Sequence, residues 1–282
     1  MRDGDGPGQR RTSTQRRELI RDRVVQTGGV RIEDLATELG VTVMTIHRDL
    51  NLLEHQGWLR KVRGGATVDS SAGIDTSVRH RLTVMTAAKE QIAECALGHV
   101  ATADAVMIDD STTALQVVHR LPGRGPLTVI TNFLMAINAL TDAADIDLIA
   151  LGGSYDATYA AFHGLPVRDQ ISKLRADVLF MSTTAILDGF LYHKSQETIL
   201  VRHALMANAA RRILLVDHTK FRRRAVHQLA ALTEFDAVIV DAGIDPEDVR
   251  AMHDLGVNVQ VAGPTGGEEP AQAAPATDPG AA

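Results

Sequence analysis

Short apolar runs alternate with amphipathic stretches from Thr76 to Ala262, and this alternation constrains most of the chain to one fold class. The runs expected as strands are Ala105–Ile108, Leu127–Thr131, Ile146–Leu151, Val178–Met181, Ile213–Asp217, Ala237–Val240 and Val257–Val261. The expected helices are Ala87–Val100, Thr113–Leu121, Phe133–Leu140, Pro166–Leu174, Glu197–Asn208 and Pro246–Leu255. Apolar strands that alternate with helices are typical of a mostly parallel sheet covered on both faces. We therefore predict an α/β domain over residues 78–262, to which residues 155–162 could add a further strand.

A helical segment at residues 12–68 precedes this α/β domain. The expected helices are 14–26, 32–39 and 43–56. Gly40 supplies the left-handed residue that a tight turn between the second and third helices needs. The expected strands are 58–63 and 66–68, joined by a turn at Gly64 and Gly65. Three short helices followed by a basic hairpin predict a winged helix-turn-helix domain.

The third helix and the hairpin carry the residues that we expect to contact DNA. Ile46, Leu50 and Leu53 form the inner stripe of the helix, and the polar residues lie largely outside it. The expected contact residues are Thr42, Met44, Thr45, His47, Arg48 and Asn51 on the helix, with Arg60, Lys61 and Arg63 on the hairpin. Arg48 is suited to a major-groove or phosphate contact, and the hairpin cations to backbone phosphates. An ordinary solvated helix would also be polar outside, but the Gly40 turn and the hairpin favour DNA binding.

The net charge of −6 conceals an uneven distribution along the chain. From Gln9 to Val68 there are eleven basic and seven acidic residues, and the remainder carries eighteen basic and twenty-eight acidic residues. A basic module joined to a larger acidic domain is consistent with binding to nucleic acid through one part only.

The third helix and the residues after it resemble the DeoR family of bacterial regulators. The resemblance rests on Val41–Leu50, Leu53–Gly57 and Gly64–Ala66. The family usually has two arginines before the Asp-Leu pair and a histidine before the two glycines. Here His47 replaces the first arginine and Arg63 replaces the histidine. Both departures lie on the expected DNA side, so the preferred operator could differ while the fold is kept.

Polar residues follow several of the expected strands, which indicates a ligand site at one edge of the sheet. The residues expected to line it are Asp109, Ser111, Thr112, Thr113, Thr131, Asn132, Gly152, Gly153 and Lys220. Free N–H groups and hydroxyls at the start of a helix favour a bound phosphate. Ser111 or Thr112 could instead simply cap the helix. Because open α/β sheets bind ligands at the carboxyl ends of their strands, we expect a small anionic ligand here.

The DeoR resemblance extends over the α/β domain, and it implies a fold like that of ribose-5-phosphate isomerase. It rests on residues 109–113, 131–132, 151–153, 162–164 and 217–221. Family members commonly sense phosphorylated sugars or related metabolites, and the resemblance implies that Ser111, Thr112, Thr113 and Lys220 hold a phosphate. Residues 182–189 depart from a glycine-containing turn of the family, so bulkier side chains there could narrow the pocket or change its ligand.

The remaining features point to a cytoplasmic protein without a metal or cofactor. The single cysteine, Cys95, excludes a disulfide framework, and no apolar run is long enough to cross a membrane. His193 and His203 are expected at the surface, and Arg222–Arg224 in a solvated loop. Residues 1–11 and 263–282 are expected to be disordered, residues 69–77 to form a linker, and residues 75–81 a hinge.

Three functions are compatible with this organisation. The leading one is a ligand-responsive transcription factor that represses a sugar-related operon and works as at least a dimer, since DNA half-sites match protein symmetry. The first alternative is a sugar-phosphate isomerase-like enzyme with an appended DNA-binding domain, with Asp109, Asp110 and Asp188 as available acids. The second is an architectural DNA-binding protein, which the size of the α/β domain disfavours.

Overall fold

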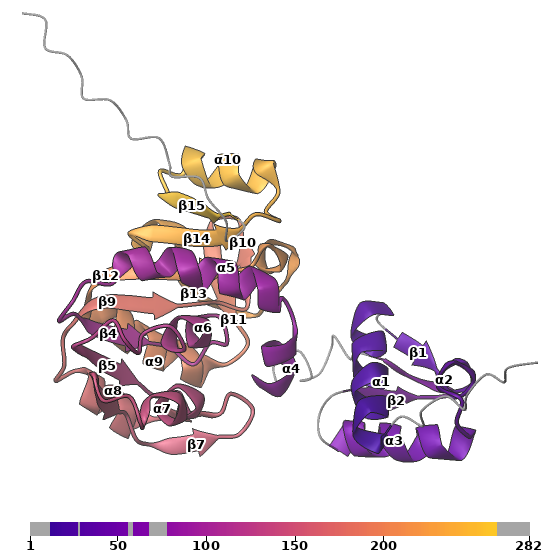
Figure 1. Cartoon of the computed structure of the whole chain (residues 1–282). Coiled ribbons are helices and arrows are strands. Elements are labelled where there is room, and N and C mark those ends of the chain that lie inside the picture. The colour runs from indigo at the N-terminus through magenta and orange to yellow at the C-terminus, as the bar shows by residue number, and fades with distance from the viewer. Residues whose placement is uncertain (1–11, 28, 56–58, 68–77, 264–282) are drawn as a thin grey trace, which may run out of the picture.

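The computed structural model describes residues 12–27, 29–55, 59–67 and 78–263, which form the two units seen in Figure 1. We call residues 12–67 the winged domain and residues 78–263 the sensor domain. The predictions for the arm 1–11, the linker 69–77 and the tail 264–282 lie outside the described residues, as do those for Trp58 and Val68. Across the part of the chain that is described, no helix is long and apolar enough to span a membrane.

The winged domain consists of three helices and a small antiparallel sheet. The helices are α1 (Ser13–Thr27), α2 (Ile32–Leu39) and α3 (Val43–His55). The strands are β1 (Gly29–Arg31), β2 (Arg60–Val62) and β3 (Gly65–Thr67), in the order β1-β3-β2. The sequence predicted the three helices and the hairpin but not β1, because a three-residue strand that begins at the second of two glycines resembles a helix end.

Local sequence explains how these helices end and pack. Gly40 has φ 63° and ends α2 in the left-handed conformation that glycine adopts without strain. Thr42 caps α3, because its Oγ1 accepts a hydrogen bond from the N–H of Thr45 at 3.2 Å. The helices bury one cluster against the sheet, which includes Ile20, Val24, Leu35, Ile46, Leu50, Leu53 and Leu59. The predicted inner stripe of α3 is therefore the centre of this core.

The sensor domain is built on a seven-stranded parallel sheet in the order β15-β14-β12-β9-β4-β5-β6. Its strands are β4 (Ala105–Ile108), β5 (Leu127–Thr131), β6 (Ile146–Ala150), β9 (Ala176–Met181), β12 (Ala209–Val216), β14 (Ala237–Asp241) and β15 (Val259–Ala262). Each of them overlaps one of the predicted strands, so the expected parallel α/β architecture is confirmed.

Helices cover both faces of this sheet. One face packs against α5 (Thr86–Ala96), α6 (Ala114–Val118) and α7 (Leu134–Leu140), and the other against α8 (Leu165–Ile171), α9 (Gln196–Ala207) and α10 (Pro246–Asp254). Alternation along β4 shows the division, because Val106 and Ile108 enter the first core and Met107 enters the second. Cys95 is half-buried beside the first core rather than inside it.

Several elements lie outside the alternating pattern. Residues 155–162 contribute to a hairpin of β7 (Ser154–Asp156) and β8 (Ala161–His163). A second sheet, in the order β10-β11-β13, contains β10 (Ala185–Leu187), β11 (Phe190–His193) and β13 (His227–Ala231) and was not predicted. The expected hinge at 75–81 is wrong for its described part, because Val78–Thr83 forms the helix α4, which is tied to the sensor domain.

Candidate nucleic-acid interface and anion pocket

The strand order creates a reversal point at the centre of the large sheet. After β4 the chain continues to β5 and β6 on one side, and after β9 it continues to β12, β14 and β15 on the other. The connections that leave the neighbours β4 and β9 therefore run to opposite sides of the sheet, and open α/β sheets bind their ligands at the carboxyl ends of such strands. Residues that follow β4, β9 and β12 can meet at this point.

A small polar cavity lies at this reversal point, and we call it the anion pocket. It is lined by Arg81, Ser111, Thr112, Thr113, Ser182, Thr183, Thr184, His193, Arg202 and Lys220. The hydroxyls come from the segments after β4 and β9, and Lys220 comes from the turn after β12. Hydroxyl donors and cations around one small space are suited to an anion such as a phosphate.

The pocket brings together only part of the site that the sequence predicts. Ser111, Thr112, Thr113 and Lys220 line it, while Asp109, Thr131, Asn132, Gly152 and Gly153 are not among its described lining residues. Thr131 ends β5, Asn132 follows it, and the two glycines come after β6, all on the side of β4 away from the reversal point. Only part of the predicted set therefore lines this cavity, and a role in ligand binding for the other strand ends stays a prediction.

The excluded residues have structural partners instead. Thr131 Oγ1 accepts a hydrogen bond from the N–H of Phe133 at 3.1 Å, and Asn132 Nδ2 donates to the carbonyl of Phe162 at 2.8 Å. The carbonyl of Gly152 accepts from Gln170 Nε2 at 2.8 Å. A Cβ on Gly153 would lie 2.5 Å from the carbonyl oxygen of His163, so this glycine permits a close backbone approach.

Asp109 and Asp110 are buried next to the pocket and both pair with one arginine. Arg202 Nη2 lies 3.0 Å from Asp109 Oδ2 and 2.9 Å from Asp110 Oδ1, and Arg202 Nη1 donates to the carbonyl of Ser182 at 2.7 Å. Asp109 also accepts from the N–H groups of Ser111 and Ser182, each at 3.0 Å. Burial raises the pKa of Asp109. Burial also acts to raise the pKa of Asp110, but the charges of Arg202 and Arg81 together with the nearby histidines lower it. This network joins the loop after β4 to the loop after β9 and to α9.

Ser111 supports both interpretations left open by the sequence. Its Oγ accepts a hydrogen bond from the N–H of Ala114 at 3.1 Å, which caps the start of α6. The same hydroxyl lines the pocket, and a hydroxyl that accepts one bond keeps its own proton for a second partner. Capping and ligand binding are therefore compatible at this residue.

His193 is buried in the pocket wall, so its expected place at the surface is wrong. Its side chain is only 2% exposed, and burial, followed by the charge of Arg202, lowers its pKa to about 3. Nδ1 lies 3.1 Å from the backbone nitrogen of Ser195 and 3.3 Å from the carbonyl oxygen of the same residue. His203 is exposed, as expected. No local pattern in the sequence distinguishes the buried histidine, which precedes α9, from the exposed one, which lies within α9.

Lys220 supplies the expected cation. Its Nζ lies 3.5 Å from Asp217 Oδ2, and burial lowers its pKa to about 8 against the opposing effect of Asp217. Lys89, on α5, is a second buried lysine that the sequence analysis missed. Its Nζ donates to the carbonyls of Arg81 and Val84, and burial lowers its pKa to about 7. Lys220 is therefore available to a ligand, whereas Lys89 is used internally.

The residues after β9 enter the pocket as the departure from the DeoR pattern suggested. Ser182, Thr183 and Thr184 all line it, and Thr183 Oγ1 donates to the carbonyl of Tyr192 at 2.9 Å. The arginines at 222–224 contribute less. Arg222 is exposed and pairs with Asp245 at 3.2 Å and Asp248 at 3.0 Å, outside the pocket lining.

The predicted DNA-contact residues lie on the outer side of the winged domain. Met44, at 64% exposure, lies on the outer side of α3 with Thr42, Arg48 and Asn51, and Arg60 and Arg63 are exposed on the wing. Thr45, His47 and Lys61 are half-buried. Lys61 Nζ lies 2.5 Å from Asn51 Oδ1, so the wing and α3 are linked on this side. The outer side of α3 and the wing thus presents polar and basic side chains to solvent.

Asp49 has a structural role inside the predicted recognition helix. It is 6% exposed and accepts from Arg16 Nε at 2.6 Å, with Arg17 Nε at 3.7 Å. These contacts tie α1 to α3 next to Arg48. Arg48 therefore faces solvent, whereas the neighbouring Asp49 fixes the position of α3 against α1.

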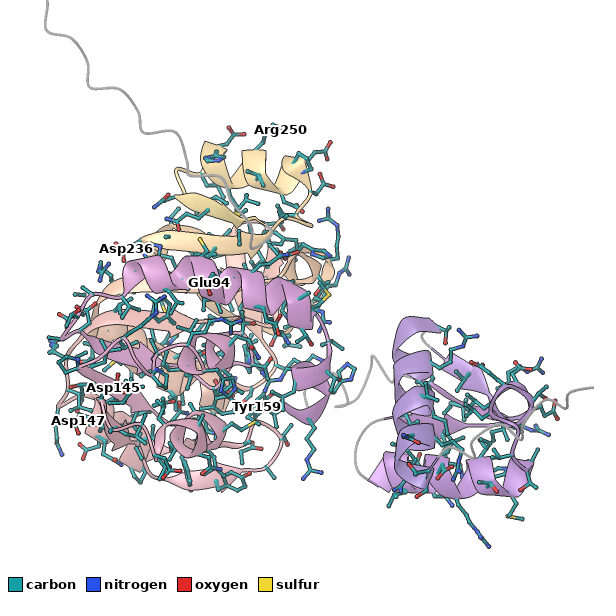
Figure 2. All side chains as sticks on the ribbon, viewed as in Figure 1. Glu94, Asp145, Asp147, Tyr159, Asp236 and Arg250 are labelled. Carbon is teal, nitrogen blue, oxygen red and sulfur yellow. The ribbon has the colours of Figure 1, made fainter. Side chains whose placement is uncertain are left out.

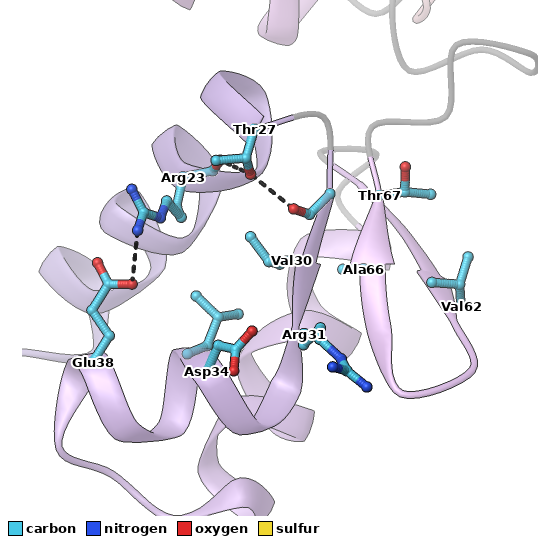
Figure 3. Close-up of a pocket in the computed structure, with 11 residues that line it drawn as sticks. Arg23, Thr27, Val30, Arg31, Asp34, Glu38, Val62, Ala66 and Thr67 are labelled. Atoms are coloured by element: carbon cyan, nitrogen blue, oxygen red, sulfur yellow. Dashed lines mark hydrogen bonds and ion pairs between the residues drawn. The ribbon is translucent and has the colours of Figure 1, made fainter.

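An open groove of about 400 Å³ lies elsewhere in the winged domain, between α1, α2 and the small sheet (Figure 3). Arg23 pairs with Glu38 across it at 3.6 Å, and Thr27 Oγ1 donates to the carbonyl of Gly29 at 2.8 Å. Its lining mixes acidic, basic and apolar residues and includes none of the predicted DNA-contact residues. The lining of the groove therefore favours neither an anionic nor a cationic ligand.

Comparison with known proteins matches both domains. The family model of a DeoR-like helix-turn-helix domain matches residues 16–72, and that of a DeoR C terminal sensor domain matches residues 84–242. The chain is 30% identical to the putative aga operon transcriptional repressor of Escherichia coli O157:H7, over 93% of this chain and 100% of that protein. It is 32% identical to the glycerol-3-phosphate regulon repressor of Escherichia coli K12, over 86% of this chain and 95% of that protein.

Other matches differ in regulatory sign or in distance. The L-fucose operon activator of Haemophilus influenzae is 29% identical over 85% of this chain and 97% of its own length. Among solved structures, ribose 5-phosphate isomerase A of Methanocaldococcus jannaschii aligns over 47% of this chain and 53% of its own, at 16% identity and a TM-score of 0.35. Since two family models together match most of the chain and a relative covers nearly all of it, this protein belongs to the DeoR family of transcriptional regulators.

Proposed function

We propose that this protein represses a carbohydrate-related operon and that a phosphorylated sugar or a related metabolite, bound in the anion pocket, controls its affinity for DNA. One observation carries the proposal. Arg81, Lys220 and six hydroxyl side chains surround a single cavity in a domain that is joined to a winged helix-turn-helix domain. The cations supply charge, and the hydroxyls of residues 111–113 and 182–184 supply hydrogen bonds in several directions, as a phosphate requires.

DNA binding is assigned to α3 and the wing. Thr42, Met44, Thr45, His47, Arg48 and Asn51 are proposed to face the major groove, and Arg60, Lys61 and Arg63 the phosphates. The uneven distribution of charge supports this assignment, since acidic side chains such as Glu94, Asp145, Asp147 and Asp236 are distributed over the sensor domain (Figure 2). The sensor domain would be repelled by DNA, which favours contact through the winged domain alone.

The proposed regulatory sign and effector rest on the relatives. Two of them are repressors by name, one of these of a glycerol-3-phosphate regulon, and a third is an activator. Repression is therefore the proposal, and glycerol 3-phosphate is one reasonable first probe among small phosphate esters. A homo-oligomer, at least a dimer, is proposed because operator half-sites require a matching symmetry in the protein.

An isomerase activity is not favoured by the geometry. A catalytic base must reach its substrate, but Asp109 and Asp110 are engaged with the buried Arg202. Asp188 lies on the exposed turn between β10 and β11 and does not line the anion pocket. The proposal therefore treats the protein as a regulator that binds its ligand without turning it over.

A pair of measurements on the full chain tests the proposal. In a thermal-shift screen of small phosphate esters, a true effector at 100 times its dissociation constant adds about 2.7 kcal/mol of stability. The hit is then added to a mobility shift with DNA from upstream of the protein's own gene, where it should change the affinity. Lys220→Met should abolish the thermal shift, while Arg175→Met, on the exposed surface, should not. If no specific DNA complex forms at moderate salt, the proposal that the protein regulates this operon fails.

A further inference from the structure

The helix α4 lies at a special place in the chain. Thr67 is the last described residue of the winged domain, and residues 68–77 connect it to Val78, where α4 begins. A change in the contacts of α4 with the sensor domain therefore acts directly on the residue where the connecting segment ends. The hydrogen bonds between α4 and the sensor domain show which of these contacts a ligand could alter.

Backbone contacts anchor α4 at both ends. The N–H of Val78 donates to the carbonyl of Thr158 at 2.8 Å. Near the other end, the carbonyl of Arg81 accepts from Lys89 Nζ and from Thr112 Oγ1, the latter at 3.3 Å. One of these donors, Thr112, is itself part of the anion pocket. The anchoring of α4 and the lining of the pocket thus share a hydroxyl.

The side chain of Arg81 enters the pocket without a complete set of partners. Its Cζ lies 5.6 Å from the ring centre of Tyr159, which Figure 2 shows beside α4. Within the described part of the chain, its Nε and Nη2 are shielded from water and have no hydrogen-bond acceptor. A buried guanidinium that lacks acceptors is costly, and an anion in the pocket would satisfy it. Burial also lowers the pKa of Arg81, which a bound anion would reverse.

A bound anion would compete with the Arg81 carbonyl for the hydroxyl proton of Thr112. A threonine hydroxyl has one proton to donate, and in the structure the Thr112 hydroxyl donates that proton to the Arg81 carbonyl. An anion that accepts it removes one backbone anchor of α4. The same anion adds a new anchor through the Arg81 guanidinium. Occupancy would thus exchange a backbone contact of α4 for a side-chain contact.

We propose that Arg81 binds the effector anion directly and that α4 transmits the occupancy of the anion pocket to the segment that joins the two domains. The inference rests on the proposed function, because it requires an anionic effector in this pocket. It goes further by naming a ligand-binding residue outside the large sheet and the element that couples the two domains. Coupling of this kind follows when one element has different contacts in the two states.

Hydrogen–deuterium exchange on the full chain tests the coupling. The probe is inorganic phosphate, raised until its thermal shift is saturated. Exchange at residues 78–84 should change at least fivefold between the free and phosphate-bound protein, while exchange at β14 should stay constant. Unchanged exchange at residues 78–84, under conditions where phosphate stabilises the protein, would overturn the inference and leave the proposed function standing.

Substitutions on α4 give a second readout. Arg81→Met should weaken phosphate at least tenfold and, when phosphate is raised to restore occupancy, should abolish its effect on DNA affinity. Arg79→Met removes an exposed arginine from the same helix and should behave as the unmodified protein. Phosphate binding by Arg81→Met that equals that of the unmodified chain would overturn the role of Arg81.

Two further outcomes are decisive. If Arg81→Met does not fold, Arg81→Lys, which keeps the charge and loses the forked donors, should show the same uncoupling in milder form. If neither phosphate nor a sugar phosphate stabilises the unmodified chain, the proposed function and this inference both fail. The thermal shift of the unmodified protein thus separates the failure of one from the failure of both.

Discussion

The winged domain and the sensor domain place their functional side chains in opposite environments. Arg48, Arg60 and Arg63 of the winged domain are exposed, whereas Arg202, His193 and Lys220 of the sensor domain are buried or nearly so. A surface residue can be exchanged with little effect on folding, but a buried charge is part of the core that holds it. Loss of function should therefore come with loss of stability in the sensor domain and without it in the winged domain.

The largest expected effect is at Arg202. Arg202→Met leaves Asp109 and Asp110 buried without their counter-charge, and breaking a buried ion pair in this way costs about 3–5 kcal/mol. Urea unfolding should show the loss in the sensor domain. Arg250→Met, at an exposed arginine labelled in Figure 2, is the control and should change stability by less than about 0.5 kcal/mol. Equal stability of the two variants would contradict the comparison.

The matching test in the winged domain is at Arg48. Arg48→Ala should weaken operator binding by about 1–3 kcal/mol, as expected for a lost base or phosphate contact, while the thermal midpoint stays unchanged. Arg23→Ala, in the groove of Figure 3, removes an arginine from the same domain away from α3 and serves as control. If Arg48→Ala lowered the free energy of unfolding as much as the free energy of DNA binding, the proposed difference between the two domains would be wrong.

Raising the pH should weaken anion binding through Lys220. Because its pKa is about 8, Lys220 is mostly protonated at pH 7 and mostly neutral at pH 9. The affinity for sulfate, which is a dianion throughout this range, should fall about tenfold between pH 7 and pH 9, close to 1.4 kcal/mol. Lys220→Arg, which stays charged in this range, should remove the fall if it still binds. A pH-independent affinity in the unmodified chain would exclude Lys220 as the titrating cation.

Acid should destabilise the sensor domain through His193. Its folded-state pKa of about 3 lies below the ordinary value of 6.5, so the unfolded chain binds more protons between these values. Stability is therefore lost as the pH falls from 6.5 towards 3, by about 1.3 kcal/mol between pH 7 and pH 5.5. His193→Gln should flatten this part of the profile, whereas His253→Gln, at an exposed position, should not. An unchanged slope in His193→Gln would show that another group titrates.

The sequence could predict the features that depend on local patterns but not those that depend on long-range packing. Helix α2 and strands β4 and β5 have the predicted limits, because strong local patterns and short connections specify them. The membership of the anion pocket depends on strand order, which no local pattern contains. Gly152 and Gly153 follow a strand just as Ser111 does, but β6 lies at the edge of the sheet and β4 lies next to the central strand, β9.

Arg81 and His193 were missed for a related reason. Arg81 lies in a short helix after the linker, and His193 ends a strand of the unpredicted second sheet. Neither carries a periodic signal, and each reaches the pocket only through long-range packing. An isolated histidine or arginine in a sequence does not reveal whether the fold will bury it.

The pairing of β4 with β9 has a consequence for folding kinetics. The bond from the N–H of Ser182 to Asp109 joins residues 73 positions apart, so the pocket floor does not exist until two distant segments have met. Contacts of such long sequence separation slow folding, since chain entropy is lost before they form. A ligand that needs the finished pocket cannot assist that search and acts on the completed structure. An effector should therefore lengthen the lifetime of the native protein by slowing its unfolding, and leave the refolding rate as it is.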